Sequence, residues 1–175
     1  MSGHSKWSQI KHKKALTDAK KSKLFSKIVR FLTVEAKLAK GDKNAPNLRA
    51  AVEKARKANV PADNIERAIK KAGEPGAQME AITYEAYGPA GIGLIIESLT
   101  DNRNRAVQEI KHALNENGGT LAGPGSVKWA FSKGGEGWQA TTTVPASEND
   151  LNQLGSLIDS LEEIDDVQEV FTNAG

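Results

Sequence analysis

The first half of the chain repeats apolar residues at the spacing of α-helices. From Thr17 onward, apolar side chains recur every three or four residues, and the pattern ends before Gly41, a residue typical of helix C-termini. Two shorter stretches with the same period follow, one opened by Asn44-Ala45-Pro46 and one by Pro61. The pattern predicts a bundle of three short helices.

The second half changes to short apolar runs that are typical of strands. The expected elements are strands at 82–86 and 91–99, a helix at 101–119, strands at 126–131 and 137–144, a helix at 147–164 and a strand at 166–172. In the strand at 126–131, Val127, Trp129 and Phe131 would share one face. After the first strand, the β-α-β-β-α-β order predicts a ferredoxin-like domain with both helices on one face of an antiparallel sheet. The predicted fold class is therefore α+β.

Charge separates the same two halves. Residues 1–75 carry 19 Lys and Arg against 7 Asp and Glu, whereas residues 76–175 carry 5 against 15. The sequence GEPGAQ at 73–78 interrupts both patterns just where the sign changes. We therefore expect a basic domain over 1–77 and an acidic domain over 78–175, and a polyanionic partner for the basic half.

Residues 1–16 have no clear hydrophobic period and predict a flexible, basic arm. A solubilising tail would explain its lysines, but not the tryptophan and isoleucine between them. Aromatic and cationic side chains together can stack on bases and contact phosphates. We predict that the arm binds nucleic acid and that the following helix extends the surface. The predicted contacts are Lys6, Trp7, Lys11, His12, Lys13, Lys14, Lys20, Lys23, Lys27 and Arg30.

A second candidate is TDNRNR at 100–105, where Thr100 or Asp101 would cap the following helix. Arg103 and Arg105 then lie in the first turn, where the helix dipole disfavours positive charge. A helix N-terminus with two arginines predicts an anion site. The alternative is a structural salt bridge, for example to Glu97 or Glu136.

Residues for catalysis or for metal binding are scarce. The chain has no cysteine, and no G-x-S-x-G, H-E-x-x-H or Walker sequence occurs. His4 and His12 lie in the arm without carboxylates nearby, and His112 is expected on a helix surface. The acidic EEIDD at 162–166 is best interpreted as a solvated helix end. We expect a protein that is not an enzyme and that holds no metal and no cofactor.

The expected location is the cytoplasm. The first residues lack the apolar run of about 7–15 residues found in signal peptides, and no stretch is long enough to span a membrane. The basic start imitates a mitochondrial transit peptide, but it is rich in lysine rather than arginine and lacks an amphipathic face. We expect a monomer without membrane contact.

Several short sequences resemble the YebC/PmpR family, which includes the mitochondrial translational activator of cytochrome oxidase. They are GHSKW (3–7), IKHKK (10–14), DAKKSKLFSK (18–27), IERAIKK (65–71), YGPAG (87–91), LTDNRNR (99–105), GG (118–119), GSV (125–127) and DDVQEVFTN (165–173). The resemblance implies a non-enzymatic protein of three domains. Family members are described as DNA-binding transcriptional regulators, and several act as translation factors on the ribosome.

The chain departs from this family in one place. The usual third domain, inserted between the strands at 126–131 and 137–144, is replaced here by SKGGE at 132–136, which is short enough for a hairpin. This replacement casts doubt on any activity that belongs to the third domain.

Three functions stay open. The first is binding of ribosomal RNA or the ribosome by a translation factor, which a long arm with an aromatic residue favours because it suits irregular RNA. The second is binding of duplex DNA by a transcriptional regulator, although no clear helix-turn-helix is visible. The third is a protein-interaction module whose acidic half docks a basic partner.

Overall fold

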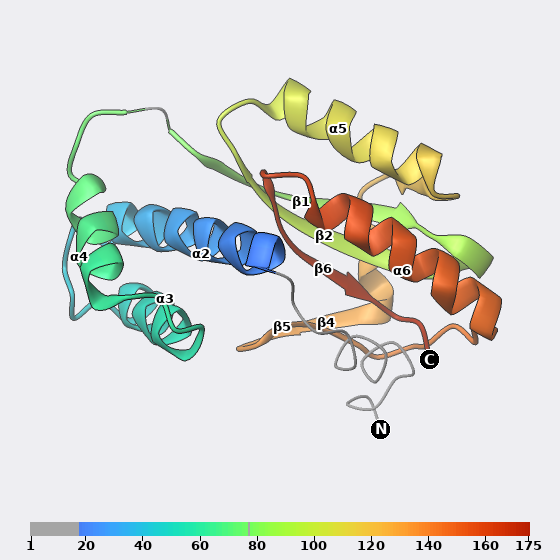
Figure 1. Ribbon diagram of the computed structural model, residues 1–175. Coiled ribbons are helices and arrows are strands. Elements are labelled where there is room, and N and C mark those ends of the chain that lie inside the picture. The colour runs from blue at the N-terminus through green and yellow to red at the C-terminus, as the bar shows by residue number, and fades with distance from the viewer. Residues whose placement is uncertain (1–17, 77) are drawn as a thin grey trace. The chain divides into compact units, whose positions relative to one another are not determined.

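The computed structural model describes residues 18–76 and 78–175. These residues divide after Met79 into two compact units, a helical unit and an α/β unit (Figure 1). The predicted arm contacts Lys6, Trp7, Lys11, His12, Lys13 and Lys14 lie outside the described residues.

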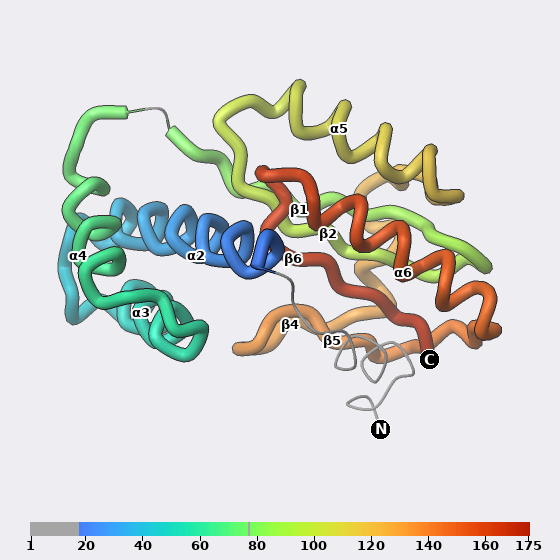
Figure 2. The backbone as a smooth tube through the Cα atoms, viewed as in Figure 1, coloured from blue at the N-terminus to red at the C-terminus, as the bar shows by residue number. Residues whose placement is uncertain are grey.

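The helical unit confirms the three predicted helices. They are α2 (Asp18–Leu38), α3 (Pro46–Lys57) and α4 (Ala62–Lys71). The long α2 packs against both shorter helices (Figure 2). Its core combines a few large side chains such as Leu32 and Leu48 with four buried alanines, which let the helix backbones approach closely.

The ends of these helices follow from their sequence. Gly41 has φ +78°, a conformation that glycine adopts without strain, and its N–H donates to the Ala36 carbonyl at 2.9 Å. Pro46 is the first residue of α3, and Pro61 precedes α4 as its N-cap. Both prolines thus stand where a missing N–H costs no helical hydrogen bond.

The α/β unit is built on a four-stranded antiparallel sheet with the strand order β3-β1-β2-β6. These strands are β1 (Glu80–Tyr87), β2 (Gly93–Thr100), β3 (Thr120–Ala122) and β6 (Val167–Thr172). Helices α5 (Arg103–Glu116) and α6 (Glu148–Glu162) pack in one core with Leu94 and Ile96 of β2. The α+β class, with an antiparallel sheet covered by two helices, is confirmed.

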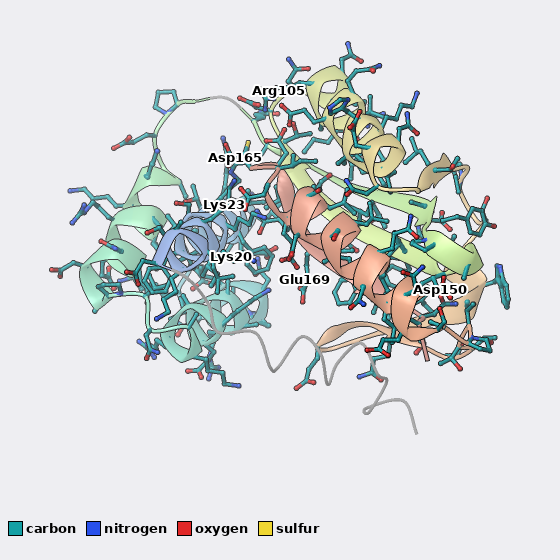
Figure 3. The ribbon with its side chains drawn as sticks, turned by 45° about the vertical axis from the view of Figure 1, so that its right-hand side comes forward. Lys20, Lys23, Arg105, Asp150, Asp165 and Glu169 are labelled. Atoms are coloured by element: carbon teal, nitrogen blue, oxygen red, sulfur yellow. The ribbon has the colours of Figure 1, made fainter. Side chains whose placement is uncertain are left out.

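Helix α6 begins with a serine cap. Ser147 accepts a hydrogen bond from the Asp150 N–H at 3.1 Å, and the Asp150 carboxylate accepts one from the Ser147 N–H at 3.0 Å. The hydrogen bond from the Ser147 N–H lowers the pKa of Asp150. Figure 3 labels Asp150.

The strands of the sheet differ from the predicted ferredoxin-like assignment. One of the two central strands, β1, precedes the predicted β-α-β-β-α-β segment, and it pairs with both β2 and β3. A short 3-10 turn at Pro89–Gly91 joins β1 to β2, so the two strands form a local hairpin. The sheet therefore contains a split β-α-β unit, β2-α5-β3, but the strand between β2 and β3 is β1, which comes before the predicted segment. Strand β3 has three residues, too few to show a period.

Two predicted strands do not join this sheet. Strands β4 (Phe131–Gly134) and β5 (Gly137–Ala140) pair only with each other among the described strands, in a hairpin that turns at residues 135–136. The predicted strand at 126–131 is instead largely a turn, with a 3-10 helix at Lys128–Ala130.

The turn changes where the side chains of 126–131 lie. Val127 and Phe131 are buried against Ile95, on the face of β2 opposite the two helices, but Trp129 is 69% exposed. The prediction that all three share one face was wrong. A 3-10 turn rotates successive side chains by about 120° rather than 180°, so alternation does not hold there.

Candidate nucleic-acid interface

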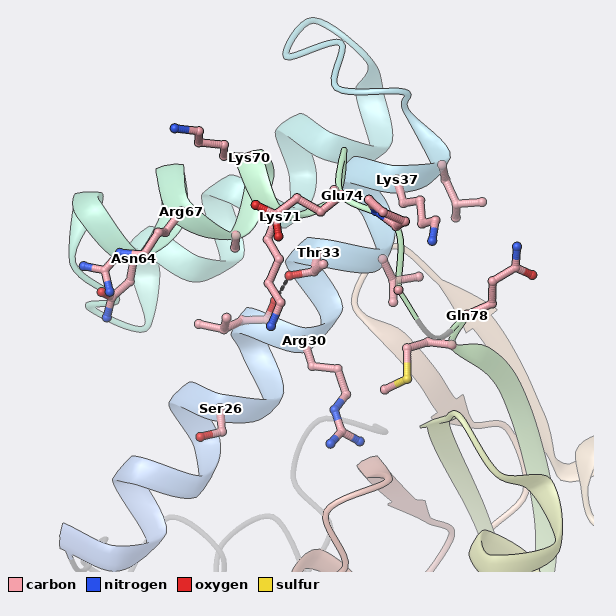
Figure 4. A pocket seen from close by; sticks show the side chains of 18 residues that line it. Ser26, Arg30, Thr33, Lys37, Asn64, Arg67, Lys70, Lys71, Glu74 and Gln78 are labelled. Carbon is pink, nitrogen blue, oxygen red and sulfur yellow. Dashed lines mark hydrogen bonds between the residues drawn. The ribbon is translucent and has the colours of Figure 1, made fainter.

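A groove of about 1260 Å³ lies in the helical unit, along α2, α4 and the segment after α4 (Figure 4). Its lining includes apolar side chains from both helices. They are Val29, Val34 and Leu38 of α2 and Ala68 of α4, with Ala72 directly after α4. The sequence forms this wall because α4 turns Ile65 and Ala68 toward the core, and its cationic residues then fall on the exposed side.

The charged side chains of the groove are almost all cationic. Helix α2 contributes Arg30 and Lys37, and α4 contributes Arg67, Lys70 and Lys71, against Glu74 alone. In Figure 4, the Lys71 side chain extends from α4 toward α2. Clustered cations in a concave surface raise the local concentration of anions, and both guanidinium and ammonium groups bind phosphate. The groove is therefore suited to a polyanion.

The residues predicted on α2 are only partly gathered at this groove. Arg30 lines it and is half-buried, and Lys20 and Lys23, labelled in Figure 3, are half-buried nearer the start of the helix. Lys27 is only 7% exposed. It was predicted as a contact together with the other three, but its burial removes it from the exposed surface.

Sequence reasoning missed the larger part of the groove. Lys37, Arg67, Lys70 and Lys71 were visible as basic residues at helical positions, and IERAIKK at 65–71 was already noted. The spacing within one helix does not reveal which neighbouring helix lies beside it. Packing of α4 against α2 was needed to bring the two groups of cations together.

At the start of α5, the helix is capped by Asn102 rather than by Thr100 or Asp101. The Asn102 side-chain oxygen accepts from the Arg105 N–H at 3.1 Å. Thr100 instead donates its hydroxyl to Asp166 at 2.9 Å. The capping residue lies one position later than expected, since Thr100 ends strand β2.

Both predicted arginines of this segment have carboxylate partners. Arg105 donates to Asp166 at 2.9 Å and to Asp101 at 2.6 Å, and these hydrogen bonds raise its pKa. Arg103 pairs with Glu80, whose hydrogen bond and charge raise the pKa of Arg103. These contacts match the salt-bridge alternative, with partners other than Glu97 and Glu136. Binding of an external anion by the two arginines stays a prediction.

Residues 18–76 and 78–175 offer little for metal binding. No group of three or more His, Cys, Asp or Glu side chains in this part of the chain could hold a metal ion. His112 is exposed on α5, as its sequence context predicted. None of the described helices is long and apolar enough to cross a membrane.

The chain matches known proteins along nearly its whole length. A family model described as the TACO1/YebC protein N-terminal domain matches residues 5–74, and one described as the TACO1/YebC second and third domain matches residues 79–136 and 136–174. The two segments of the latter match meet at residue 136, in the β4–β5 turn.

Individual relatives agree with these matches. A probable transcriptional regulatory protein of Chlorobaculum parvum is 49% identical over 178 residues, covering 98% of this chain and 68% of the relative. One from Pelodictyon phaeoclathratiforme is 50% identical over 161 residues, covering 90% and 62%. The crystal structure of the conserved hypothetical protein Aq1575 from Aquifex aeolicus has 33% sequence identity and a TM-score of 0.84, covering 98% of this chain and 97% of that one. The chain thus spans about two thirds of the length of the two bacterial relatives.

Proposed function

Because the chain belongs to the TACO1/YebC family, we propose that it is a nucleic-acid-binding regulator of gene expression whose α2–α4 groove contacts phosphates. The observation that carries the proposal is the balance of five cations against one acid in that groove. Relatives named probable transcriptional regulatory proteins support a regulatory role. The groove supplies binding rather than catalysis.

Within this proposal, RNA of the ribosome is favoured over promoter DNA. Helix-turn-helix proteins insert a protruding recognition helix into the major groove of DNA. Here the cations line a concave surface with an apolar wall, which suits a strand lying within it. The names of the relatives favour the second candidate, a regulator bound to duplex DNA. The cytoplasm is the expected location for either partner.

A pair of double variants tests the role of the groove. Arg67→Ala/Lys71→Ala removes one arginine and one lysine from the groove, and Arg49→Ala/Lys57→Ala removes the same charges from exposed positions on α3. Binding of a single-stranded RNA is measured between about 50 and 200 mM salt. We expect the groove variant to lower the slope of log affinity against log salt by about 1.4, since each phosphate contact contributes about 0.7. Equal slopes for the two variants would contradict the proposal.

Two further measurements separate the candidate partners at about 150 mM salt. The favoured version predicts that the protein co-sediments with ribosomes and that excess random duplex DNA does not displace it. Binding to a specific promoter fragment about a thousandfold tighter than to random DNA, without co-sedimentation, would instead establish the transcriptional role.

A further inference from the structure

Two exposed aromatic side chains lie on the α/β unit, away from the groove residues in the sequence. Trp129 is 69% exposed and Tyr87, at the end of β1, is 41% exposed. The Trp129 Nε1–H and the Tyr87 hydroxyl both donate to the carbonyl oxygen of Ser126, at 2.9 and 3.2 Å. We call these two side chains the aromatic platform. Because their polar atoms already share one internal acceptor, the rings offer solvent mainly π and apolar surface.

The backbone below the platform is fixed by a buried carboxylate. Glu85 is 4% exposed and accepts hydrogen bonds from the N–H groups of Gly125, Val127 and Lys128, at 2.7, 2.9 and 2.7 Å. Burial by itself raises the pKa of Glu85, but these bonds and the charge of Lys128 together hold it below its ordinary value. The turn that carries Trp129 is thus ordered before any ligand arrives, which lowers the entropy cost of binding.

Buried residues before and after Trp129 in the sequence also hold this turn in place. Val127 and Ala130 are 2% and 1% exposed, in the core beneath β2. The other tryptophan of the described residues, Trp138, packs against this same core and donates its Nε1–H to Glu97. Trp138 therefore has a structural explanation, whereas Trp129 covers no part of the core. A large, rigid and exposed aromatic side chain is typical of a binding surface.

The charge around the platform differs from that of the unit as a whole. Residues 76–175 hold 15 acids, yet residues 117–135 hold two lysines, Lys128 and Lys133, and no acid. The carboxylate that contacts this turn belongs to Glu85 of β1, which is buried and accepts hydrogen bonds from three N–H groups. A second carboxylate, that of Glu97, lies 3.8 Å from the Lys133 ammonium group, so Lys128 is the lysine available to a phosphate. A phosphate can therefore approach here without meeting exposed negative charge from this stretch.

We propose that the aromatic platform stacks an unpaired base of a single-stranded nucleic acid, with Lys128 beside it as the cation for a phosphate. Every base has a π-face, so stacking on tryptophan or tyrosine tolerates any sequence. The inference rests on the proposed function and adds a second contact. This contact lies in the α/β unit, whose net negative charge had not suggested a polyanionic partner. It also predicts a short contact, because the rest of this unit is acidic and repels the strand.

Substitution of Trp129 in the full chain tests the inference. A fluorescently labelled oligouridylate of about 12 nucleotides, which exceeds the smallest single-strand binding sites, is titrated with wild type, Trp129→Ala and Trp129→Phe. We expect Trp129→Ala to weaken binding by about 5- to 150-fold, the range for one stacked base, and Trp129→Phe to restore most of the loss. The slope of log affinity against log salt stays unchanged for Trp129→Ala, since no phosphate contact is removed.

The outcomes separate this inference from the proposed function. If wild type binds and the groove variant lowers the salt slope but Trp129→Ala binds like wild type, only the platform inference is overturned. If wild type does not bind RNA at all, the platform inference and the favoured RNA version are both overturned, and if it does not bind duplex DNA either, the proposed function is overturned as well. If Trp129→Ala loses binding to a proline-rich peptide but binds RNA like wild type, the platform is a peptide site and base stacking is overturned. Thermal unfolding of each variant confirms that it is folded.

Discussion

The helical unit and the α/β unit differ in where their acidic side chains lie. In the helical unit, the ion pairs Lys43–Glu66 and Arg56–Glu53 connect side chains that are each more than 60% exposed. In the α/β unit, Glu85 and Asp166 are 4% and 3% exposed and hold neighbouring segments by hydrogen bonds. The acidic side chains of the helical unit are exposed or half-buried, whereas two acids of the α/β unit are buried inside the fold.

This difference changes the meaning of net charge. The excess of acids in residues 76–175 suggested a surface that docks a basic partner. Two of those acids are buried, and Glu80 and Asp101 pair with arginines. The acidic composition therefore serves the fold in part, and it describes the surface of this unit less well than the basic composition describes the helical unit.

The largest expected effect is the loss of the Glu85 carboxylate. Glu85→Ala leaves three N–H groups without their acceptor, so we expect the free energy of unfolding to fall by about 2–5 kcal/mol. Glu109→Ala, at an exposed position of α5, is the control and should change it by at most about 0.5 kcal/mol. If urea unfolding shows an equal loss of stability for Glu85→Ala and Glu109→Ala, buried and exposed carboxylates do not differ in their contribution to stability.

The pH dependence of the same variant sharpens this prediction. The pKa of Glu85 is lower in the folded protein than its ordinary value of 4.5. Its ionised form therefore stabilises the fold above pH 4.5, and this contribution is lost as the pH falls through the lowered value. The difference in stability between wild type and Glu85→Gln should shrink in that acidic range and stay constant near neutral pH.

A smaller effect is expected at Asp166. Asp166→Ala removes the acceptor of both Thr100 and Arg105, and we expect a loss of about 1–3 kcal/mol. Arg105→Ala should lower the melting temperature more than Arg103→Ala, because Arg105 pairs with the buried Asp166 whereas Arg103 pairs with the exposed Glu80. The reverse order would show that burial of the partner does not decide the strength of these pairs.

The smallest effect is expected for an exposed pair of the helical unit. Lys43→Ala removes the 3.0 Å contact to Glu66, yet stability should change by at most about 1 kcal/mol, because both side chains are solvated. The small difference should decrease further when salt is raised. A loss as large as that of Asp166→Ala would mean that the helical unit also depends on its ion pairs.

Local sequence was sufficient for most elements of the fold. The three helices, the hairpin of β4 and β5 and the serine cap of α6 depend on periodicity and on residues with strong positional preferences. The basic character of the helical unit was equally visible, because the exposed cations of an amphipathic helix keep their charge wherever the helix packs.

Contacts between distant residues decided the rest. Pairing of β1 with β3, the groove formed by Arg30 and Lys71, and the ion pair of Arg105 with Asp166 each join residues at least 30 positions apart. The exposure of Trp129 is the clearest case, because a strand would have buried it and the bonds from residues 125, 127 and 128 to Glu85 impose a turn. The sequence by itself determined the helices, the turns and the division of charge, which depend on neighbours along the chain. Only the tertiary structure decided which strands pair, which charges are buried and which aromatic ring faces solvent, because burial and long-range hydrogen bonds depend on packing in three dimensions.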